Sequence, residues 1–485
     1  MKIIRLIAVL AICMSSMSIA QAQDVVYSPY EKFDFRGGDF FVVGKIGGRI
    51  YAYRGSVEGY FLDAYNDSME RVATVVLDFF PPKIYDVRFI PYANQIIVLY
   101  QGIEGNKITL YGALLDGTGR LKKTPVVLDN AKTGLFGPTR TYFSYAFSED
   151  KKYVVAFSAR DKGKVFEFEG KWIDDQLNVV QRSKASYKAD NDVQHGEAMV
   201  GNDGNVYLPL YTPVGTKQYS DQAWLLSLKQ NDTKFTTIQL PLSKAYAASL
   251  FMKVDNVNNR IYAGGFYSEK KAGSYQGVLF GYYDMAGGQF QNVKTIAFDE
   301  KLINETAQHN KKHAFDNYQV KQIIVKNDGG FVMLSEEYFI NARTSYTPGF
   351  GTYSFYYNPY MSQSIREYHY DDVMALSYDG QGNRQWDAFI YKNQYSIEDG
   401  GLFSSYILLN TGGSLGFLYN DFRENGSGVQ LATIDGDGKV NGHSFGASGG
   451  DNPDWMPRSG KQVSAREIVV PCLHKKQICF AKVIF

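Results

Sequence analysis

The stretch SSYILLNTGGSLGFLYNDFRENGSGVQLATIDGDGKVNGHSFG, residues 404–446, decides the fold, because four short apolar strands follow one another in it. The strands are expected at 406–409, 415–419, 429–434 and 440–445. The turns at 410–413 and 435–438 are rich in Asn, Asp and Gly, which tolerate the positive φ of tight hairpins. Residues 404–446 therefore predict one sheet of four antiparallel strands.

The same pattern of strand, tight turn and strand recurs along the chain. The first hairpins of the other units are expected at 41–53, 87–100, 143–157, 198–208, 251–263 and 323–334, with a last hairpin at 468–480. Second hairpins turn at 116–119, 286–288 and 379–382. Four short antiparallel strands repeated in this way are typical of a β-propeller. We predict an all-β propeller of seven to eight four-stranded blades, with eight favoured.

An outer-membrane barrel is the main alternative, and strand length argues against it. Barrel strands need about ten residues of apolar/polar alternation. The stretch Ile96-Ile-Val-Leu99 is instead short and apolar on both faces, which suits sheets stacked face to face. The eighth unit has only two expected strands, so the N-terminal strand around 25–35 is predicted to complete that blade beside the C-terminal hairpin. Seven blades result if the hairpin joins the first unit instead.

The N-terminus has the features of a secretory signal. Lys2 and Arg5 precede an apolar stretch, and Ala20-Gln-Ala22 matches a cleavage site. We predict a signal peptide at 1–22 and a single propeller domain at 23–485. The protein is expected to be exported to the periplasm, the outer-membrane surface or the extracellular space. No later run reaches the ~18 apolar residues of a spanning helix, so no transmembrane segment is expected.

Two cysteines remain after the signal peptide. Cys472 and Cys479 are separated by six residues across an expected turn, a spacing that suits a bridge between paired strands. Because exported proteins meet oxidising conditions, we predict a disulfide rather than a metal pair or reactive thiols.

Charge and motifs exclude several classes of function. A formal net charge of +1 gives no electrostatic case for binding nucleic acid. No Gly-x-Ser-x-Gly elbow, phosphate loop, dinucleotide fingerprint or zinc-binding cysteine cluster is present. Glu305, His309 and His313 could share one helical face, but no further metal ligand is identifiable. Asp435-Gly-Asp-Gly438 is interpreted as a turn, since it lacks the distal Glu of a calcium loop. No cofactor, metal or catalytic residue is assigned.

Connection lengths divide the propeller into two faces. The tight turns join strands one to two and three to four, on one face, here called the plain face. The long connections lie on the other, the decorated face: 129–142, 189–197, 212–221, 300–317, 337–371, 391–402 and 447–463. Long loops on a rigid scaffold are the usual place for binding.

The largest insertion, 337–371, is rich in Tyr and Phe. Its rings could contact a sugar or a protein, or they could bury one another against the propeller. Two charged clusters, at 195–197 and 366–372, also fall on the decorated face and could support acid–base chemistry. The candidate binding residues are Tyr346, Phe350, Tyr353, Phe355, Tyr356, Tyr357, Tyr360, Arg366, His369, His195 and Glu197.

Three N-terminal motifs carry a resemblance to a known group. Tyr30-Glu-Lys-Phe-Asp34, Val42-Val-Gly-Lys45 and Ile50-Tyr-Ala-Tyr-Arg54 resemble uncharacterised exported propeller proteins of the Bacteroidetes. The resemblance covers most of the chain and implies a propeller fold and export, without a known activity. Asp379-Gly-x-Gly382 followed by Trp386 also resembles quinoprotein-type repeats. Only one unit has that Trp, and no quinone is inferred.

Two functions from different classes fit these observations. The first is a monomeric, non-enzymatic binding or scaffold protein that presents the decorated face to a protein or glycan at the cell envelope. The second is a propeller hydrolase or lyase acting on polysaccharide, with carboxylates and His195 or His369 around the central channel. A purely structural envelope component is the third possibility.

Overall fold

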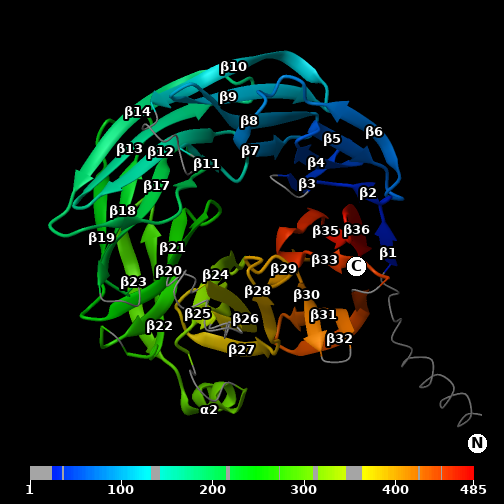
Figure 1. The fold of residues 1–485 in the computed structure, drawn as a ribbon. Helices are drawn as coiled ribbons and strands as arrows, with labels where there is room; N and C mark the ends of the chain where they lie inside the picture. The colour runs from blue at the N-terminus through cyan, green and yellow to red at the C-terminus, as the bar shows by residue number, and fades with distance from the viewer. Residues whose placement is uncertain are drawn as a thin grey trace, which may run out of the picture.

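The computed structural model is a ring of β-sheets seen along its axis in Figure 1. It describes residues 24–34, 38–132, 142–214, 219–271, 273–309, 315–345, 363–423, 426–448 and 451–485. These residues form seven antiparallel sheets, and the nine-stranded one combines two units through the single pair Ser220–Ala247. Eight units therefore surround the axis, which confirms the predicted propeller and the favoured blade number.

The strands follow one another in chain order from the axis to the rim of each blade. Blade one consists of β3 (Asp39–Ile46), β4 (Arg49–Ser56), β5 (Gly59–Tyr65) and β6 (Arg71–Val76). Blade two consists of β7 (Ile84–Pro91), β8 (Gln95–Glu104), β9 (Lys107–Asp116) and β10 (Leu121–Lys132). Blade three consists of β11 (Ser144–Phe147), β12 (Val154–Lys162), β13 (Val165–Ile173) and β14 (Val179–Lys188). Blade four consists of β15 (Gln194–His195), β16 (Met199–Val200), β17 (Val206–Val214), β18 (Tyr219–Leu228) and β19 (Thr236–Leu240).

The second half of the ring continues this order. Blade five consists of β20 (Tyr246–Asp255), β21 (Arg260–Ser268), β22 (Gly277–Asp284) and β23 (Gln289–Ala297). The helix α2 (Glu300–His309) connects it to blade six, which consists of β24 (Tyr318–Val325), β25 (Phe331–Ser345), β26 (Gln363–Tyr378), β27 (Arg384–Ile390) and β28 (Gln394–Ile397). Blade seven consists of β29 (Tyr406–Asn410), β30 (Ser414–Arg423), β31 (Gly426–Asp435) and β32 (Val440–Ser448).

Blade eight closes the ring with strands from both ends of the described chain. It consists of β33 (Asp454–Trp455), β34 (Lys461–Ser464), β35 (Glu467–His474), β36 (Gln477–Ile484), β1 (Asp24–Tyr27) and β2 (Glu31–Lys32), with the 3-10 turn η2 (Pro457–Ser459) before β34. β1 pairs with β36 from Asp24 opposite Ile484 to Tyr27 opposite Ala481. The predicted closure is therefore confirmed, and the seven-blade alternative is wrong.

One expectation about blade eight is corrected. Residues 447–463 were expected to be a long connection, yet β33 and the start of β34 lie within them and pair with β35. Together they form the innermost strand of the blade. A two-residue strand shows no alternation that a sequence could reveal, which is why the unit appeared to have only two strands of its own.

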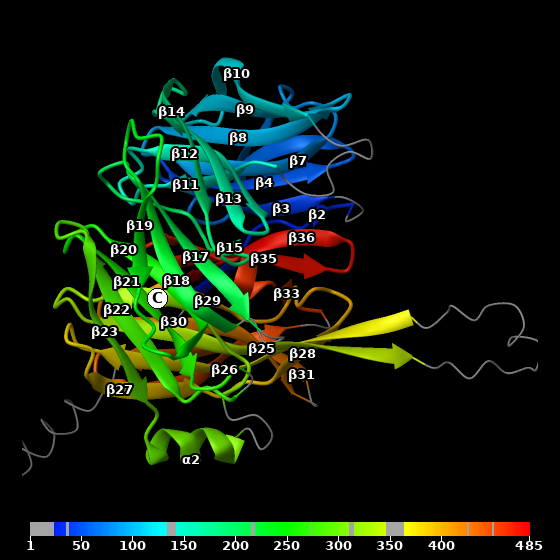
Figure 2. The ribbon, with the colours of Figure 1, turned by 90° about the vertical axis from the view of Figure 1, so that its left-hand side faces the viewer.

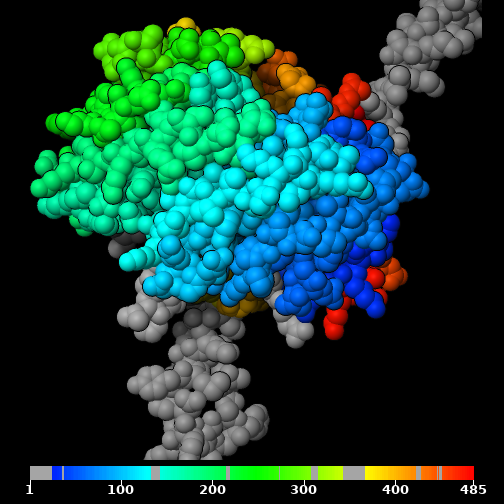
Figure 3. Space-filling view, turned by 90° about the horizontal axis from the view of Figure 1, so that it is seen from above, coloured from blue at the N-terminus to red at the C-terminus, as the bar shows by residue number. Residues whose placement is uncertain are grey.

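The core is divided among the blade interfaces. The described residues contain eight buried apolar clusters, and each one joins neighbouring blades, including blade eight with blade one. The edge-on view in Figure 3 shows the first blades following one another around the rim in chain order. Sheets that are apolar on both faces require such stacking, because every blade must cover both neighbours.

The turns behave as their sequences predict. In the 435–438 turn, Asp435 Oδ1 accepts hydrogen bonds from the backbone N–H groups of Asp437 and Lys439 at 3.0 and 2.9 Å. Asp379 makes the equivalent pair of bonds in blade six. The carboxylate is thus part of a repeated turn.

No helix of the described residues is long and apolar enough to cross a membrane.

Candidate functional site

The longest strands of the described chain form an arm on the decorated face. β25 and β26 have 15 and 16 residues, and beyond the blade they remain paired from Tyr338 opposite Tyr370 to Ser345 opposite Gln363. Figure 2 shows this pair projecting from the ring. The term arm is used below for 338–345 and 363–370. The flanks of the 337–371 insertion, expected to be a loop, are therefore strands.

Most of the predicted aromatic binding residues belong to the part of the chain between β25 and β26 that the structure does not describe. Tyr346, Phe350, Tyr353, Phe355, Tyr356, Tyr357 and Tyr360 are outside the described residues. Their role as binding residues stays a prediction. Arg366 and His369 are described, and both belong to β26 within the arm.

A β-bulge marks the base of the arm. Glu336 lies opposite Val373, and the next pair along the strands is Tyr338 opposite Tyr370, so Glu337 faces both Asp371 and Asp372. A bulge bends a strand and changes the direction of its side chains. It places four acidic residues, Glu336, Glu337, Asp371 and Asp372, where the arm leaves the blade.

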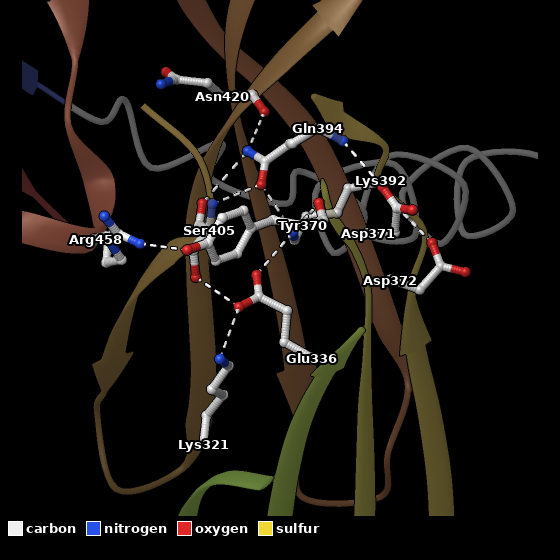
Figure 4. A network of polar contacts seen from close by, with 10 residues as sticks. All are labelled: Lys321, Glu336, Tyr370, Asp371, Asp372, Lys392, Gln394, Ser405, Asn420 and Arg458. Carbon is white, nitrogen blue, oxygen red and sulfur yellow. Dashed lines mark hydrogen bonds and ion pairs between the residues drawn. The ribbon is translucent and has the colours of Figure 1, made fainter. Parts of the chain in front are cut away.

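Glu336 is the centre of a buried polar network at this base (Figure 4). Its carboxylate is 2.9 Å from Lys392 Nζ, and it accepts a hydrogen bond of 2.8 Å from Ser405 Oγ. Lys321 Nζ lies 4.0 Å away. Lys392 Nζ also donates to the backbone oxygen of Tyr370 at 2.8 Å. The network thus connects β24, β25 and β26 of blade six with the segment that enters blade seven.

Gln394 and Asn420 extend the network across two blade boundaries. Gln394 Nε2 donates to the backbone oxygen of Asn420 at 2.7 Å, and Ser405 N–H donates to Gln394 Oε1 at 2.7 Å. Asn420 Nδ2 in turn donates to the backbone oxygen of Trp455 in β33 at 2.7 Å. Blades six, seven and eight are therefore joined by hydrogen bonds at the base of the arm.

Two tyrosines and two cations cover the network. Arg458 Nη1 donates to the Tyr370 hydroxyl at 2.5 Å, and its guanidinium lies 5.4 Å from the centre of the Tyr370 ring. The Tyr338 and Tyr370 rings are 4.6 Å apart. Lys321 Nζ is 5.0 Å from the Tyr338 ring. Cations above ring faces are attracted by the negative π-surface, so these contacts fix the two rings at the root of the arm.

Burial shifts the pKa values in this network. It lowers the pKa of Lys392, although Glu336 acts in the opposite direction, and it raises the pKa of Asp371 despite the nearby Lys392. Burial also raises the pKa of Tyr370 to about 12, with Arg458 opposing the shift. A buried charge in this network raises the free energy of the folded state unless its partner is present, as expected of a paired buried cluster.

His369 lies in an aromatic row across the arm and β28. Its ring stacks on Phe339 at 4.4 Å with an interplanar angle of 8°, and lies 5.1 Å from the Tyr395 ring. The pairing of β25, β26 and β28 places these three residues side by side on one face. Ile397 lies on the same face, two residues beyond Tyr395. Tyr395 and Ile397 are 40% and 51% exposed. The four residues are called the arm-root patch below.

The other predicted cluster lies on a different blade. His195 begins blade four, and its Nδ1 is 2.8 Å from Asp161 Oδ2 of blade three, with the Phe166 ring at 5.4 Å. Glu197 is exposed. His369 belongs to β26 of blade six, two blades further along the ring from His195 in β15. The structure therefore keeps apart the two clusters that the sequence suggested as parts of one site.

Metal and disulfide predictions have separate outcomes. Glu305 and His309 belong to α2, while His313 lies outside the described residues, and no group of three potential ligands is found in the described part of the chain.

Cys472 and Cys479 are directly opposite each other on β35 and β36, and both are buried free thiols. The predicted disulfide is thus absent from the structure, although the strand register matches it.

Comparisons with known proteins concern the fold. No protein-family model and no curated protein sequence matches the chain. Prolyl oligopeptidase B from Galerina marginata is similar at 11% identity, with a TM-score of 0.41, over 93% of this chain and 56% of the oligopeptidase. An ulvan lyase described as a polysaccharide lyase is similar at 9% identity and a TM-score of 0.40, over 81% of this chain and 90% of the lyase.

A third similar structure is a propeller domain alone. The Nup133 β-propeller domain of Vanderwaltozyma polyspora has 8% identity and a TM-score of 0.39, over 83% of this chain and 99% of that domain. Because similar propellers include enzymes as well as non-enzymes, this likeness indicates no activity.

Proposed function

We propose that this protein is an exported, non-enzymatic propeller that binds a protein or glycan of the cell envelope through the arm on its decorated face. The observation that carries the proposal is the arm-root patch. Phe339, His369 and Tyr395 form a continuous aromatic surface with Tyr395 exposed at one end, and the exposed Ile397 extends it. Rings with a polar edge suit the apolar faces of sugars and the centres of protein interfaces.

The buried network supports this assignment by fixing the patch in place. Glu336, Lys392 and Gln394 connect the base of the arm to the neighbouring blades through buried contacts. Binding costs less when the contacting side chains are already ordered. An arm that leaves the ring from such a rigid base can present a binding surface away from the body of the protein.

Export and cell-envelope location form part of the proposal. They rest on the signal-like features of residues 1–22 and on the resemblance to exported Bacteroidetes propellers. A disulfide between Cys472 and Cys479 belongs to the same proposal, because export would expose the facing thiols to oxidising conditions.

The test uses three purified variants against a panel of polysaccharides and envelope extract. One variant replaces 341–364 with a short Gly-Ser linker, a second is Tyr395→Ser with Ile397→Ser, and the control is Val257→Ser. Val257 is 86% exposed in the turn between β20 and β21, on the plain face. We expect the first two variants to lose a partner that the wild type and the control retain. Equal retention by all folded variants would contradict the proposal.

A specific observation favours polysaccharide hydrolysis or lysis as the second candidate. His195 Nδ1 is 2.8 Å from Asp161 Oδ2, a geometry in which a carboxylate orients an imidazole for proton transfer. The test incubates the protein and its His195→Ala variant with the same polysaccharides. New reducing ends, or the ultraviolet absorbance of unsaturated uronates, that vanish in the variant would favour the enzyme over the binding protein.

A further inference from the structure

A lysine occupies a glycine position of the internal repeat. In blade three the turn between the first two strands places Lys151 at φ +58°, and its N–H donates to the backbone oxygen of Ser148 at 2.9 Å. Blades four and six form the same turn with Gly204 and Gly329, at φ +78° and with equivalent bonds of 2.9 and 3.1 Å. Glycine adopts this conformation freely, whereas other residues seldom do. A lysine kept here calls for a reason beyond the turn itself.

The Lys151 side chain is directed toward the inner strand of blade two. Its Nζ donates to the backbone oxygen of Pro91 at 2.8 Å, and the Tyr92 hydroxyl donates to the backbone oxygen of Lys151 at 2.9 Å. These two bonds fix both the backbone and the ammonium group. The strained turn thus positions a cation beside the end of β7.

A second lysine approaches the same wall from blade eight. Lys461 is the first residue of β34, and its Nζ donates to the backbone oxygen of Val43 in β3 at 2.7 Å. The next residue, Gly44, lies against Pro91, since a Cβ at Gly44 would be 3.4 Å from Pro91 Cγ. The carbonyls that hold Lys151 and Lys461 therefore belong to adjoining inner strands of blades one and two.

Arg88 supplies a third cation on the same inner strand as Pro91. It is exposed, and its guanidinium lies 6.0 Å from the Phe147 ring. Burial together with the charges of Arg88 and Lys151 lowers the pKa of Lys461 to about 8. Of the described carboxylates, none lies within ion-pair distance of Arg88, Lys151 or Lys461. Three cations are thus gathered without a compensating anion from the described chain.

We propose that Arg88, Lys151 and Lys461 form a binding site for an oxyanion, sulfate or phosphate, at the axis of the ring. The innermost strands of blades one, two and eight and the adjoining turn of blade three form this site. Each ammonium has three N–H donors and gives one to a backbone carbonyl, and the guanidinium has five. Donors therefore remain for the oxygens of the anion, and the anion relieves the repulsion among the three cations.

The site is independent of the arm. Its three cations belong to blades two, three and eight, whereas the arm belongs to blade six. The free oxyanion and the sulfate or phosphate group of a larger molecule share the chemistry that these donors recognise. Failure of the site would leave the proposed function of the arm untouched.

The experiment measures sulfate and phosphate binding by calorimetry, with sodium chloride at equal ionic strength as the reference. The variants are Lys151→Gly and Arg88→Gln, and the control is Lys253→Met, an exposed lysine of inner strand β20 in blade five. We expect at least one of the two oxyanions to bind the wild type and the control. Affinity should fall at least tenfold in both variants, and the tighter-bound anion identifies the preferred group.

Thermal unfolding separates loss of the site from loss of the fold. Lys151→Gly restores the glycine that the repeat uses in blades four and six, so its melting temperature without oxyanion should equal or exceed that of the wild type. A folded Lys151→Gly or Arg88→Gln variant that binds as tightly as the wild type would overturn the proposal. The same holds if neither oxyanion binds the wild type more tightly than chloride.

Discussion

Replacing Lys392 by methionine tests the role of the buried network. The change leaves the Glu336 carboxylate fully buried with its Ser405 hydrogen bond and with Lys321 at 4.0 Å, but without the ammonium at 2.9 Å. Breaking a buried ion pair by removing one partner costs about 3–5 kcal/mol. Because Lys321 and Ser405 remain, we expect a loss of about 3 kcal/mol in the free energy of unfolding.

The double variant Glu336→Gln with Lys392→Met shows whether the loss comes from the unpaired carboxylate. A neutral amide needs no cation and can still accept the Ser405 hydrogen bond, so stability should return to within about 1 kcal/mol of the wild type. Guanidinium denaturation followed by tryptophan fluorescence measures these differences. Lys253→Met serves as the control, because that lysine is exposed. A loss below about 1 kcal/mol in the single variant, or no recovery in the double variant, would refute the assigned role of the pair.

Two further predictions concern pH and redox state. The pKa of Lys461 is lowered to about 8, so the folded state loses this proton well before the unfolded state, whose lysine titrates near 10.5. Stability relative to Lys461→Met should therefore rise by about 2 kcal/mol between pH 8 and pH 10. Urea titrations showing parallel curves for the two proteins would contradict this. Oxidised glutathione should convert the facing Cys472 and Cys479 to a disulfide, seen as a mass loss of about 2 Da. Closing this short loop should add about 2 kcal/mol to the free energy of unfolding. A mixed disulfide with glutathione as the sole product would contradict the strand register.

Local sequence signals predicted the repeat because turns and strands obey local rules. Asn, Asp and Gly at tight turns between apolar strands identified the 404–446 unit, and the structure has all four strands there. The shortage of strands in the eighth unit indicated closure by the N-terminal strand. Closure joins two distant parts of the chain, but the number of strands missing from the last unit could be counted from the sequence.

The candidate site could be predicted only in part. The density of aromatic residues between 337 and 371 located the insertion, but composition did not distinguish a loop from the flanking strands of an arm. Glu336 carried a usable signal, since alternation places it on the same face as the buried Val332 and Leu334. An acidic residue on an apolar face predicts a buried partner. That partner, Lys392, is distant in sequence, and only the assembled blades bring the two together.

The arm-root patch depended on strand register. Phe339, His369 and Tyr395 become neighbours through pairing among β25, β26 and β28. A shift by one residue would place alternate side chains on the other face. The sequence contained the three rings, but it did not specify the register that aligns them.

The central claim is that the arm contacts a partner, and photo-crosslinking in living cells tests it most directly. A photoreactive residue would replace Ile340, which is 49% exposed within the arm, or Val257 on the plain face. The account predicts discrete higher-mass adducts from the Ile340 position and none from the Val257 position. Adducts of equal yield from both positions, or adducts from Val257 alone, would contradict it.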